Sequence, residues 1–144
     1  MFEGSYPLML DAKGRLTLPA EVRPEILDQC GGKLTVARHF GPFLRLYPQP
    51  EWLRFRTFLA EKATVKMEDT RRLIIGTADP VQMDGAGRIL ISPHLRKAVR
   101  LDRQVVLVGD ITRFELWDEE TLTRRLEQLA DAGVPEELQN VIGI

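Results

Sequence analysis

Residues 11–17 read Asp11-Ala12-Lys13-Gly14-Arg15-Leu16-Thr17, and a matching heptapeptide, Asp84-Gly85-Ala86-Gly87-Arg88-Ile89-Leu90, occupies residues 84–90. Both copies contain Asp-x-x-Gly-Arg followed by an apolar run that is typical of a β-strand. A pattern that occurs twice in one chain, 73 residues apart, indicates two copies of one structural unit. The heptapeptide therefore predicts a duplicated fold.

The residues that follow each copy support the duplication. Arg23 and Arg96 keep the spacing of 73 residues, whereas the strand-like stretch 44–47 matches residues 114–117 at a spacing of 70. Loops of slightly different length explain this drift, because lengthening a loop costs little free energy.

Each half is predicted to run strand, turn, strand, short helix and two further strands, with a helix behind it. In the first half, residues 15–18 are expected to return beside the strand formed by residues 2–10 and to complete a hairpin. Pro19 is expected to begin a short helix over residues 20–29, because proline is favoured in the first helical turn. Residues 73–77 are expected to form, or to lead into, the first strand of the second half.

The resulting fold class is mixed α+β, rich in short β-strands. We place the two repeats at residues 5–48 and 76–119, with helices over residues 51–72 and 119–131. A unit of this size rarely buries enough surface to be stable alone. Both halves of the 144-residue chain are therefore expected to share one core.

Charge is distributed unevenly along the chain. The net charge is −1, but residues 118–144 carry seven acidic and two basic side chains, whereas residues 1–117 carry 14 acidic and 18 basic ones. Fifteen of the 20 cations are arginine, whose planar guanidinium suits phosphates and guanine edges. A genome rich in G and C would produce the same bias, so the arginine content by itself leaves a nucleic-acid partner open.

Other features argue against several classes of protein. No apolar run approaches the roughly 20 residues that span a bilayer, and the N-terminus lacks the pattern of a secretory signal. We therefore expect a cytoplasmic protein without a membrane partner. The single Cys30 forms no internal disulfide, and His39 and His94 have no metal-ligand spacing. Because phosphate-binding loops and nucleophile motifs are also missing, we expect no enzyme activity, no metal and no cofactor.

The chain resembles the MraZ family of bacterial transcriptional regulators, which act on the cell-division and cell-wall gene cluster. The residues that carry the resemblance lie in both halves and in the right order. They are Met1-Phe2-x-Gly4-x-Tyr6, Leu10 to Leu16, Leu46-Tyr47-Pro48, Trp52, Asp84 to Ile91, Pro93-His94-Leu95-Arg96, Val108-Gly109 and Phe114-Glu115-Leu116-Trp117. The match covers about residues 1–130.

The resemblance implies a duplicated SpoVT/AbrB-like fold, a swapped-hairpin β-barrel with pseudo-twofold symmetry and flanking helices. It also implies homo-oligomeric rings that bind direct repeats in promoter double-stranded DNA, so that the protein is associated with the nucleoid. Arg15 and Arg88 match the two Asp-x-x-x-Arg motifs of the family, which face DNA.

The chemistry of the turns agrees with a DNA-binding role. A turn projects its side chains, and Arg15, Lys13 and Arg88 can contact phosphates or base edges from such a position. Ala86 stands in the second turn where the first has its lysine, so the second turn carries less positive charge. Three cations per chain are too few for tight binding, and a DNA-binding role therefore requires several chains that act together.

The turn residues also have structural interpretations. Asp11 and Asp84 are expected to bond the turn backbone or to hold the following arginine. Gly14 and Gly87 are expected to permit a positive φ angle. Internal pairing with aspartate is the alternative role for the two arginines, and a solvated surface position is the alternative for Lys13. The rival function is a ring-forming scaffold that binds an acidic protein or RNA, without preference among DNA sequences.

Overall fold

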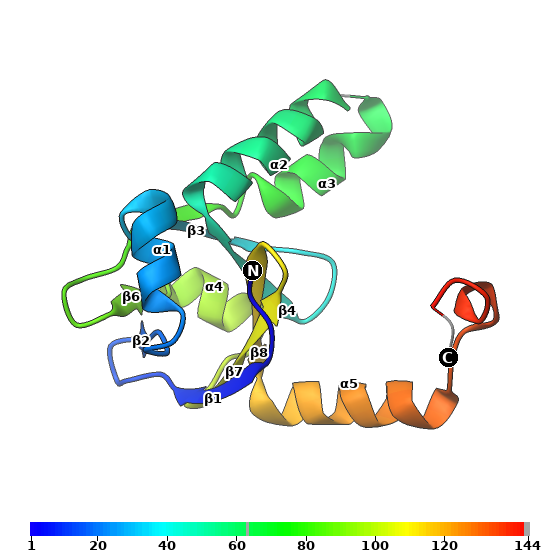
Figure 1. Ribbon diagram of the computed structural model, residues 1–144. Helices are drawn as coiled ribbons and strands as arrows, with labels where there is room; N and C mark the ends of the chain where they lie inside the picture. Colours follow the sequence, from blue (N-terminus) through cyan, green and yellow to red (C-terminus); the bar gives the residue numbers. More distant parts are fainter. Residues whose placement is uncertain (63, 143–144) are drawn as a thin grey trace.

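The computed structural model describes residues 1–62 and 64–142, in which short antiparallel strands alternate with helices (Figure 1). In chain order the elements are β1 (Ser5–Met9), β2 (Arg15–Thr17), α1 (Arg23–Cys30), β3 (Lys33–Arg38), β4 (Phe43–Pro48), α2 (Gln49–Glu61), η1 (Val65–Met67), α3 (Glu68–Ile74), β5 (Asp79–Gln82), β6 (Arg88–Leu90), α4 (Pro93–Ala98), β7 (Gln104–Asp110), β8 (Arg113–Asp118), α5 (Glu119–Ala132) and η2 (Glu136–Leu138). The mixed α+β class predicted from the sequence is confirmed.

The larger sheet has six antiparallel strands in the order β1-β7-β8-β4-β3-β5. Its outer strands are exchanged between the halves, because β1 pairs with β7 of the second half and β5 pairs with β3 of the first. The strands of the two halves correspond in pairs: β1 to β5, β3 to β7 and β4 to β8. If each strand is replaced by its counterpart, the same order is obtained in reverse. The chain consequently has an approximate twofold axis between β4 and β8, where Arg45 lies opposite Glu115.

Residues 15–18 do not complete a hairpin with the first strand, which corrects the expectation from the sequence. β2 pairs instead with β6, the equivalent strand of the other half, and Leu16 lies opposite Ile89. Only an isolated bridge from Leu10 to Leu16 joins β2 to the end of the first strand in the described residues. The physical reason is burial: each three-residue strand places its central side chain in the core between the halves.

The main core joins both halves, as expected. Leu16 and Leu44 of the first half belong to the same buried cluster as Ile89 and Leu116 of the second. Apolar burial in this shared layer is the dominant favourable contribution to folding, so the two halves stabilise each other.

The helix of the first half begins later than expected. α1 starts at Arg23 rather than directly after Pro19, and the intervening turn is closed by the Val22 N–H, which donates to the Pro19 carbonyl at 3.1 Å. Pro24 explains the difference, because a proline inside a helix lacks one N–H and clashes with the preceding turn. It is tolerated only in the first turn of α1. α4 begins at Pro93, as predicted.

Residues 73–77 lead into the first strand of the second half and do not form it, which is the second of the two alternatives expected from the sequence. α3 extends to Ile74, and the strand β5 begins only at Asp79. α3 folds back along α2 as a helical hairpin (Figure 1), and Ile74 is buried with Trp52 and Leu59 of α2. A short apolar run fits a buried helix as well as a strand, and periodicity alone does not separate the two.

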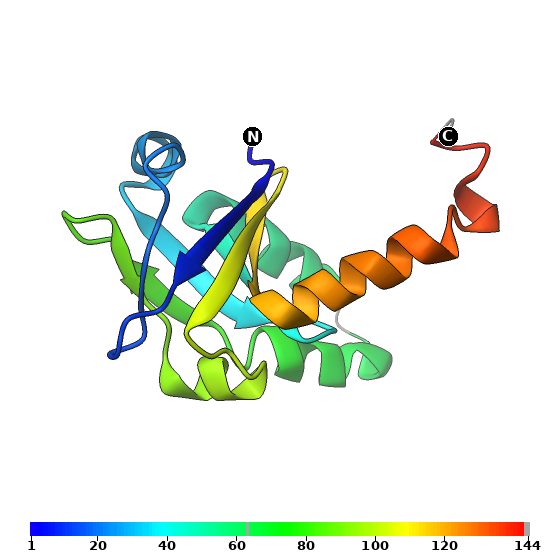
Figure 2. The ribbon, with the colours of Figure 1, turned by 90° about the horizontal axis from the view of Figure 1, so that it is seen from below.

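α5 follows β8 and projects from the body of the molecule (Figures 1 and 2). Asp118 caps its first turn by accepting a hydrogen bond from the Thr121 N–H at 3.0 Å. Leu122 is the buried residue of this helix. Across the described ranges 1–62 and 64–142, none of the helices combines the length and apolar character that crossing a bilayer requires.

Candidate nucleic-acid interface

The first turn is held together by the carboxylate of Asp11. Its Oδ1 accepts hydrogen bonds from the backbone N–H groups of Lys13 at 2.9 Å and Arg15 at 2.8 Å. Its Oδ2 accepts one from Arg15 Nε at 2.7 Å. The Gly14 N–H donates to the Asp11 carbonyl at 3.0 Å and closes the backbone turn. Local bonding of this kind is the reason that aspartate is favoured in turns.

The second turn repeats these bonds. Asp84 Oδ1 accepts from the N–H groups of Ala86 and Arg88, and Oδ2 accepts from Arg88 Nε, each at 2.9 Å. Gly14 and Gly87 have φ angles of +84° and +80°. These left-handed values are easy for glycine and costly for other residues. The sequence repeat is therefore a repeat of one turn conformation.

Both turn carboxylates are stabilised in the ionised form. The pKa of Asp11 lies below its usual value, chiefly because the Arg15 backbone N–H donates to it, and the Arg15 side chain adds to the effect. The pKa of Asp84 is lowered in the same way by the Arg88 backbone N–H and side chain. Hydrogen bonds to a carboxylate favour its charged form. Each arginine thus lies beside a negative charge at neutral pH.

Arg15 and Arg88 lie on the outward face of the β2–β6 ribbon. Successive residues of a strand point to opposite faces, and the neighbours Leu16 and Ile89 are buried in the core. In the antiparallel register, Arg15 lies opposite Leu90, two residues beyond Arg88, and Arg88 lies opposite Thr17, two residues beyond Arg15. The two arginine side chains, 35% and 37% exposed, therefore lie diagonally across one short ribbon.

Each of these arginines pairs with its own aspartate, the internal arrangement that the sequence left open. The hydrogen bonds use Nε, and in the described parts of the chain no other hydrogen bond involves the guanidinium amino groups of Arg15 or Arg88. An ion pair at this exposure adds little to stability, because water screens it. Its clearer effect is to fix the orientation of each guanidinium while the amino groups remain available for another acceptor.

Arg23 and Arg96 are 73 residues apart in the sequence. Each of them contacts the turn that belongs to the other half. The guanidinium of Arg96 lies against Gly14, and that of Arg23 lies against Gly87, so that a Cβ at either glycine would overlap it. Each arginine also donates Nε to a carbonyl five residues earlier, at 2.9 and 2.7 Å. Sequence reasoning recognised this spacing but assigned it no role.

Backbone hydrogen bonds reinforce the link between the turns. The Ile91 N–H donates to the Gly14 carbonyl at 2.9 Å, and the Leu18 N–H donates to the Gly87 carbonyl at 2.8 Å. Each turn is thus bonded to the strand end of the other half. Both turns lie at the same end of the molecule, beside β2 and β6 (Figures 1 and 2).

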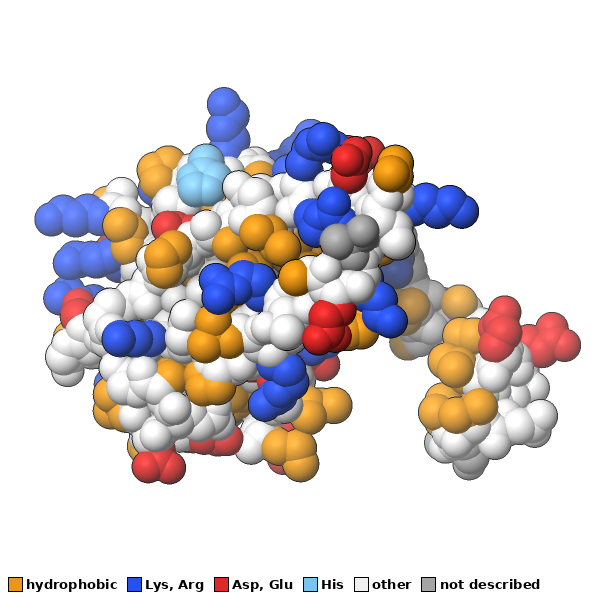
Figure 3. Space-filling view, turned by 90° about the horizontal axis from the view of Figure 1, so that it is seen from above, with side chains coloured by type: hydrophobic (Ala, Val, Ile, Leu, Met, Phe, Trp, Pro, Cys, Tyr) orange, Lys and Arg blue, Asp and Glu red, His pale blue; other side chains and the backbone are white. Residues whose placement is uncertain are grey.

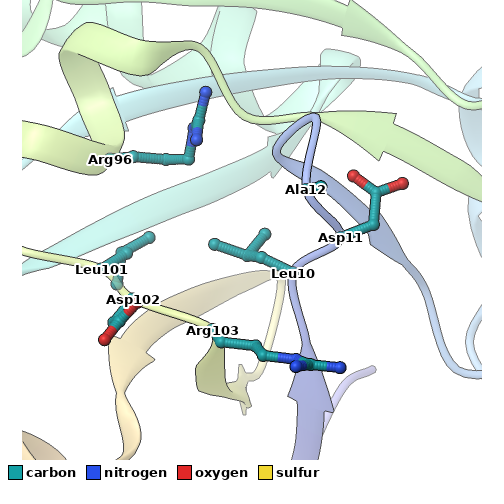
Figure 4. A pocket seen from close by; sticks show the side chains of 7 residues that line it. All are labelled: Leu10, Asp11, Ala12, Arg96, Leu101, Asp102 and Arg103. Carbon is teal, nitrogen blue, oxygen red and sulfur yellow. The ribbon is translucent and has the colours of Figure 1, made fainter.

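A hollow beside the first turn contains further charged side chains (Figure 4). Arg96 and Arg103 line it, together with Asp11 and Asp102. Arg103 is placed there because its carbonyl accepts a hydrogen bond from the Leu10 N–H at 2.8 Å. Sequence reasoning missed Arg103, since only the exchange of β1 into the other half brings these segments together.

The second turn has less positive charge around it. Met83, at the position equivalent to Leu10, donates its N–H to the Gly32 carbonyl at 2.8 Å, so glycine stands where the first turn has Arg103. Ala86 likewise replaces Lys13. The first turn is therefore the more cationic of two otherwise equivalent turns.

The other candidate reactive groups are the single cysteine and the two histidines. Cys30 Sγ donates to the Ile26 carbonyl of its own helix at 3.2 Å. Burial, with the nearby charge of Arg45, lowers the pKa of His39. Within the described residues, no three His, Cys, Asp or Glu side chains are grouped as metal ligands. The chemistry that the turns offer is recognition of anions by oriented guanidinium groups.

Comparison with known proteins identifies the family. The family described as "MraZ protein, putative antitoxin-like" matches residues 1–73 and again residues 74–142. A protein named transcriptional regulator MraZ from Cupriavidus taiwanensis is 41% identical over 140 residues, which cover 97% of this chain and 98% of that protein. A protein of the same name from Burkholderia mallei is 42% identical over 142 residues, with the same coverage of 97% and 98%. The chain therefore belongs to the MraZ family of transcriptional regulators and contains two MraZ repeats.

Proposed function

We propose that this protein is a sequence-specific, double-stranded DNA-binding regulator of a cell-division and cell-wall gene cluster. It binds direct repeats in a promoter as a homo-oligomeric ring and works in the cytoplasm, at the nucleoid. Arg15, Lys13 and Arg88 are the DNA-contacting residues. The observation that carries this proposal is the β2–β6 ribbon, which presents one arginine from each repeat on its outward face.

The geometry of the ribbon suits a DNA groove. The major groove of B-DNA admits a two-stranded β-ribbon, and a guanidinium donates well to guanine O6 and N7 or to phosphate oxygens. Because Asp11 and Asp84 already orient Arg15 and Arg88, less side-chain freedom is lost on binding. Base contacts provide specificity, whereas Lys13, which is exposed in the first turn, is suited to a phosphate contact.

The asymmetry of the two turns favours an unequal contribution. Lys13 and Arg103 add positive charge near the first turn, and Ala86 and Gly32 stand at the matching positions of the second. Phosphate contacts supply most of the affinity of a DNA-binding protein. We therefore assign the stronger contact to the first turn.

The charge of one chain supports assembly. The turn carboxylates oppose a polyanion, and the net charge of the chain is −1. Several chains on adjacent DNA repeats raise the effective concentration of each contact and convert weak binding into strong binding. A closed ring of identical chains is one arrangement that presents the turns at regular intervals.

We further propose that the exchanged strands form a swapped-hairpin barrel of the AbrB type, with repeats at residues 5–48 and 76–119. The exchange of β1 and β5, and the pairing of β2 with β6, support this assignment. In this arrangement a single chain supplies both halves of the DNA-facing ribbon.

A titration tests the proposed function. Wild-type protein is added to a fluorescent duplex from the promoter upstream of its own gene and to a scrambled duplex of equal length, at one salt concentration. We expect tighter binding to the promoter duplex. Equal affinity for the two duplexes would contradict the proposal and favour the alternative, a ring-forming scaffold for protein or RNA.

A further inference from the structure

Arg23 and Arg96 are two further arginines at the end of the molecule that carries the turns. Figure 3 shows Lys and Arg side chains projecting at the left, the end at which Figure 1 places β2 and β6. Arg23 begins α1, Arg96 lies in α4, and both residues are partly buried. Within residues 1–62 and 64–142, neither side chain forms an ion pair, and each donates one hydrogen bond, from Nε to a backbone carbonyl. Neutral backbone groups therefore set the position of each guanidinium.

The peptide bond between Gly14 and Arg15 is held at both of its polar atoms. Its N–H, from Arg15, donates to Asp11 Oδ1 at 2.8 Å, a bond within the first turn. Its carbonyl, from Gly14, accepts from the Ile91 N–H at 2.9 Å, a bond from the other half. A shift of this peptide would also shift the backbone from which the Arg15 side chain projects.

Arg96 covers the same peptide and is anchored on the same core residue. Its guanidinium lies against Gly14, and Figure 4 shows the side chain reaching from α4 toward the first turn. Arg96 Nε donates to the Ile91 carbonyl at 2.9 Å, while the Ile91 N–H is the donor to Gly14. Ile91 is fully buried. The first turn and Arg96 are thus fixed to one another through the core of the second half.

The second turn has the same arrangement with the halves exchanged. The Arg88 N–H donates to Asp84 Oδ1 at 2.9 Å, and the Gly87 carbonyl accepts from the Leu18 N–H at 2.8 Å. Arg23 lies against Gly87 and donates Nε to the Leu18 carbonyl at 2.7 Å. Leu18 is fully buried. Each turn is therefore supported by the half of the chain that does not contain it.

We propose that Arg96 and Arg23 are positioning residues for DNA recognition, and that each acts on the DNA-contacting arginine of the other repeat. Arg96 fixes the turn that presents Arg15, and Arg23 fixes the turn that presents Arg88. A side chain that is held in place before binding loses less conformational freedom on binding, so its contact with DNA is stronger. The inference rests on the proposed function, in which Arg15 and Arg88 contact DNA.

The contacts of the two arginines distinguish positioning from a direct phosphate contact. Each uses Nε for a backbone carbonyl and presses its guanidinium against a glycine. A lysine carries the same charge, but its ammonium is a compact group at the end of a flexible chain and cannot make both contacts. Arg96→Lys therefore retains a charge for a phosphate and removes the positioning.

Hydrogen–deuterium exchange without DNA tests the positioning. Peptides that cover residues 11–15 report on the first turn, and peptides that cover residues 84–88 report on the second. We expect Arg96→Ala to accelerate exchange roughly tenfold in the first turn and to leave the second near wild type, because local opening follows local contacts. Arg23→Ala should reverse this pattern. Faster exchange in both turns of Arg96→Ala, or in neither, would overturn the proposal.

Two further variants make the exchange experiment independent of global stability. Arg96→Lys keeps the charge and the aliphatic part of the side chain, and we expect it to accelerate exchange in the first turn alone, as Arg96→Ala does. Lys97→Ala changes an exposed residue of the same helix and should leave both turns at wild-type exchange. Acceleration of the first turn by Lys97→Ala would assign the effect to α4 as a whole and overturn the role of Arg96.

Double variants test the consequence for DNA binding. Arg96→Ala alone should weaken binding to the promoter duplex roughly fivefold. The same change should cause a similar further loss in Arg88→Ala and little further loss in Arg15→Ala, because the side chain that it positions is already absent. Fluorescence anisotropy at one salt concentration gives the affinities. Equal further losses in the two backgrounds would overturn the proposal, as would full recovery of affinity in Arg96→Lys.

The mirrored set of variants completes the test. Arg23→Ala should add little to the loss in Arg88→Ala and its full effect to that in Arg15→Ala. Because Arg23→Ala must still weaken Arg15→Ala, a mere loss of measurable binding in Arg15→Ala does not imitate the expected pattern. Equal effects of Arg23→Ala in both backgrounds would contradict the crosswise arrangement.

The two kinds of measurement separate this inference from the proposed function. If exchange follows the crosswise pattern but the wild-type protein binds promoter and scrambled duplexes equally, the proposed function is wrong and the support of each turn by the opposite arginine stands. If promoter binding is specific but exchange is not crosswise, the positioning role alone is wrong.

Discussion

Gly14 lies beneath the guanidinium of Arg96, a residue from the other half of the chain. A side chain at this position would overlap Cζ and Nε of the arginine, and the φ angle of +84° is itself unfavourable for any residue with a Cβ. The first turn therefore requires glycine for a local reason and for a tertiary one. Gly87 and Arg23 have the same relationship in the second turn.

Gly14→Ala is expected to lower the free energy of unfolding by about 1–2 kcal/mol from backbone strain, with a further loss from displacement of Arg96. Gly85→Ala is the matched control, because its Cβ would meet nothing within 4 Å and its φ is not positive. The control should stay within about 0.5 kcal/mol of wild type. Urea denaturation measures both, and equal stabilities of the two variants would contradict this account of the turn.

Acid is expected to weaken the turns. The pKa values of Asp11 and Asp84 are lower in the folded chain than the usual value, so their contribution to stability is complete above the unfolded pKa, about 3.9, and is lost as pH falls through the folded pKa. Asp11→Asn retains an acceptor oxygen and does not ionise. Its free energy of unfolding should therefore fall less than that of wild type between about pH 5 and pH 3. Parallel curves of the free energy of unfolding against pH for the variant and the wild type would show that ionisation of Asp11 does not contribute to stability.

Arg15→Ala is expected to weaken binding to the promoter duplex by about 1–3 kcal/mol, roughly 5-fold to 150-fold, because an oriented guanidinium is lost from the ribbon. Arg88→Ala should cause a smaller loss, since fewer cations surround the second turn. Fluorescence anisotropy measures both affinities, and thermal unfolding verifies that the fold is retained. A larger loss for Arg88→Ala would reverse the proposed order of the two turns.

The lysine of the first turn allows a reciprocal experiment. Lys13→Ala should reduce the slope of log K against log salt by about 1, because one phosphate contact is removed. Ala86→Lys places the same charge in the equivalent turn and should increase the slope if the second turn also approaches the DNA backbone. Anisotropy at several salt concentrations gives both slopes, and an unaltered slope for Lys13→Ala would assign this lysine to plain solvated surface.

Arg103→Ala is expected to weaken binding to promoter and scrambled duplexes alike, by a similar factor, because a phosphate contact carries no sequence information. Lys97→Ala is the control, since Lys97 is exposed on α4 and does not line the hollow beside the first turn. Comparable losses for the two variants would indicate a general effect of charge rather than a contact made from the hollow.

Local patterns predicted the elements whose determinants are close in sequence. The strands β3 and β4 and the helix α5 lie where alternation and helical spacing place them. The helix α1 begins later than predicted from Pro19. Pro24 has to lie in the first turn of the helix, and this requirement outweighs the preference for a helix start at Pro19. For residues 73–77 the sequence left two alternatives, a strand or a segment that leads into one, because a short apolar run has no period of its own. Only the packing of Ile74 against α2 decides its conformation.

The sequence by itself determined the duplication, the family and the conformation of the two turns, because the hydrogen bonds that the Asp11 and Asp84 carboxylates accept join residues no more than four positions apart. Only the tertiary structure decided that β2 pairs with β6, that Arg96 covers Gly14 and that Arg103 lies beside the first turn. These relationships join residues more than 70 positions apart. They depend on the exchange of strands between the halves, which buries Leu16 against Ile89, and no local pattern in either heptapeptide encodes which strand will be its partner.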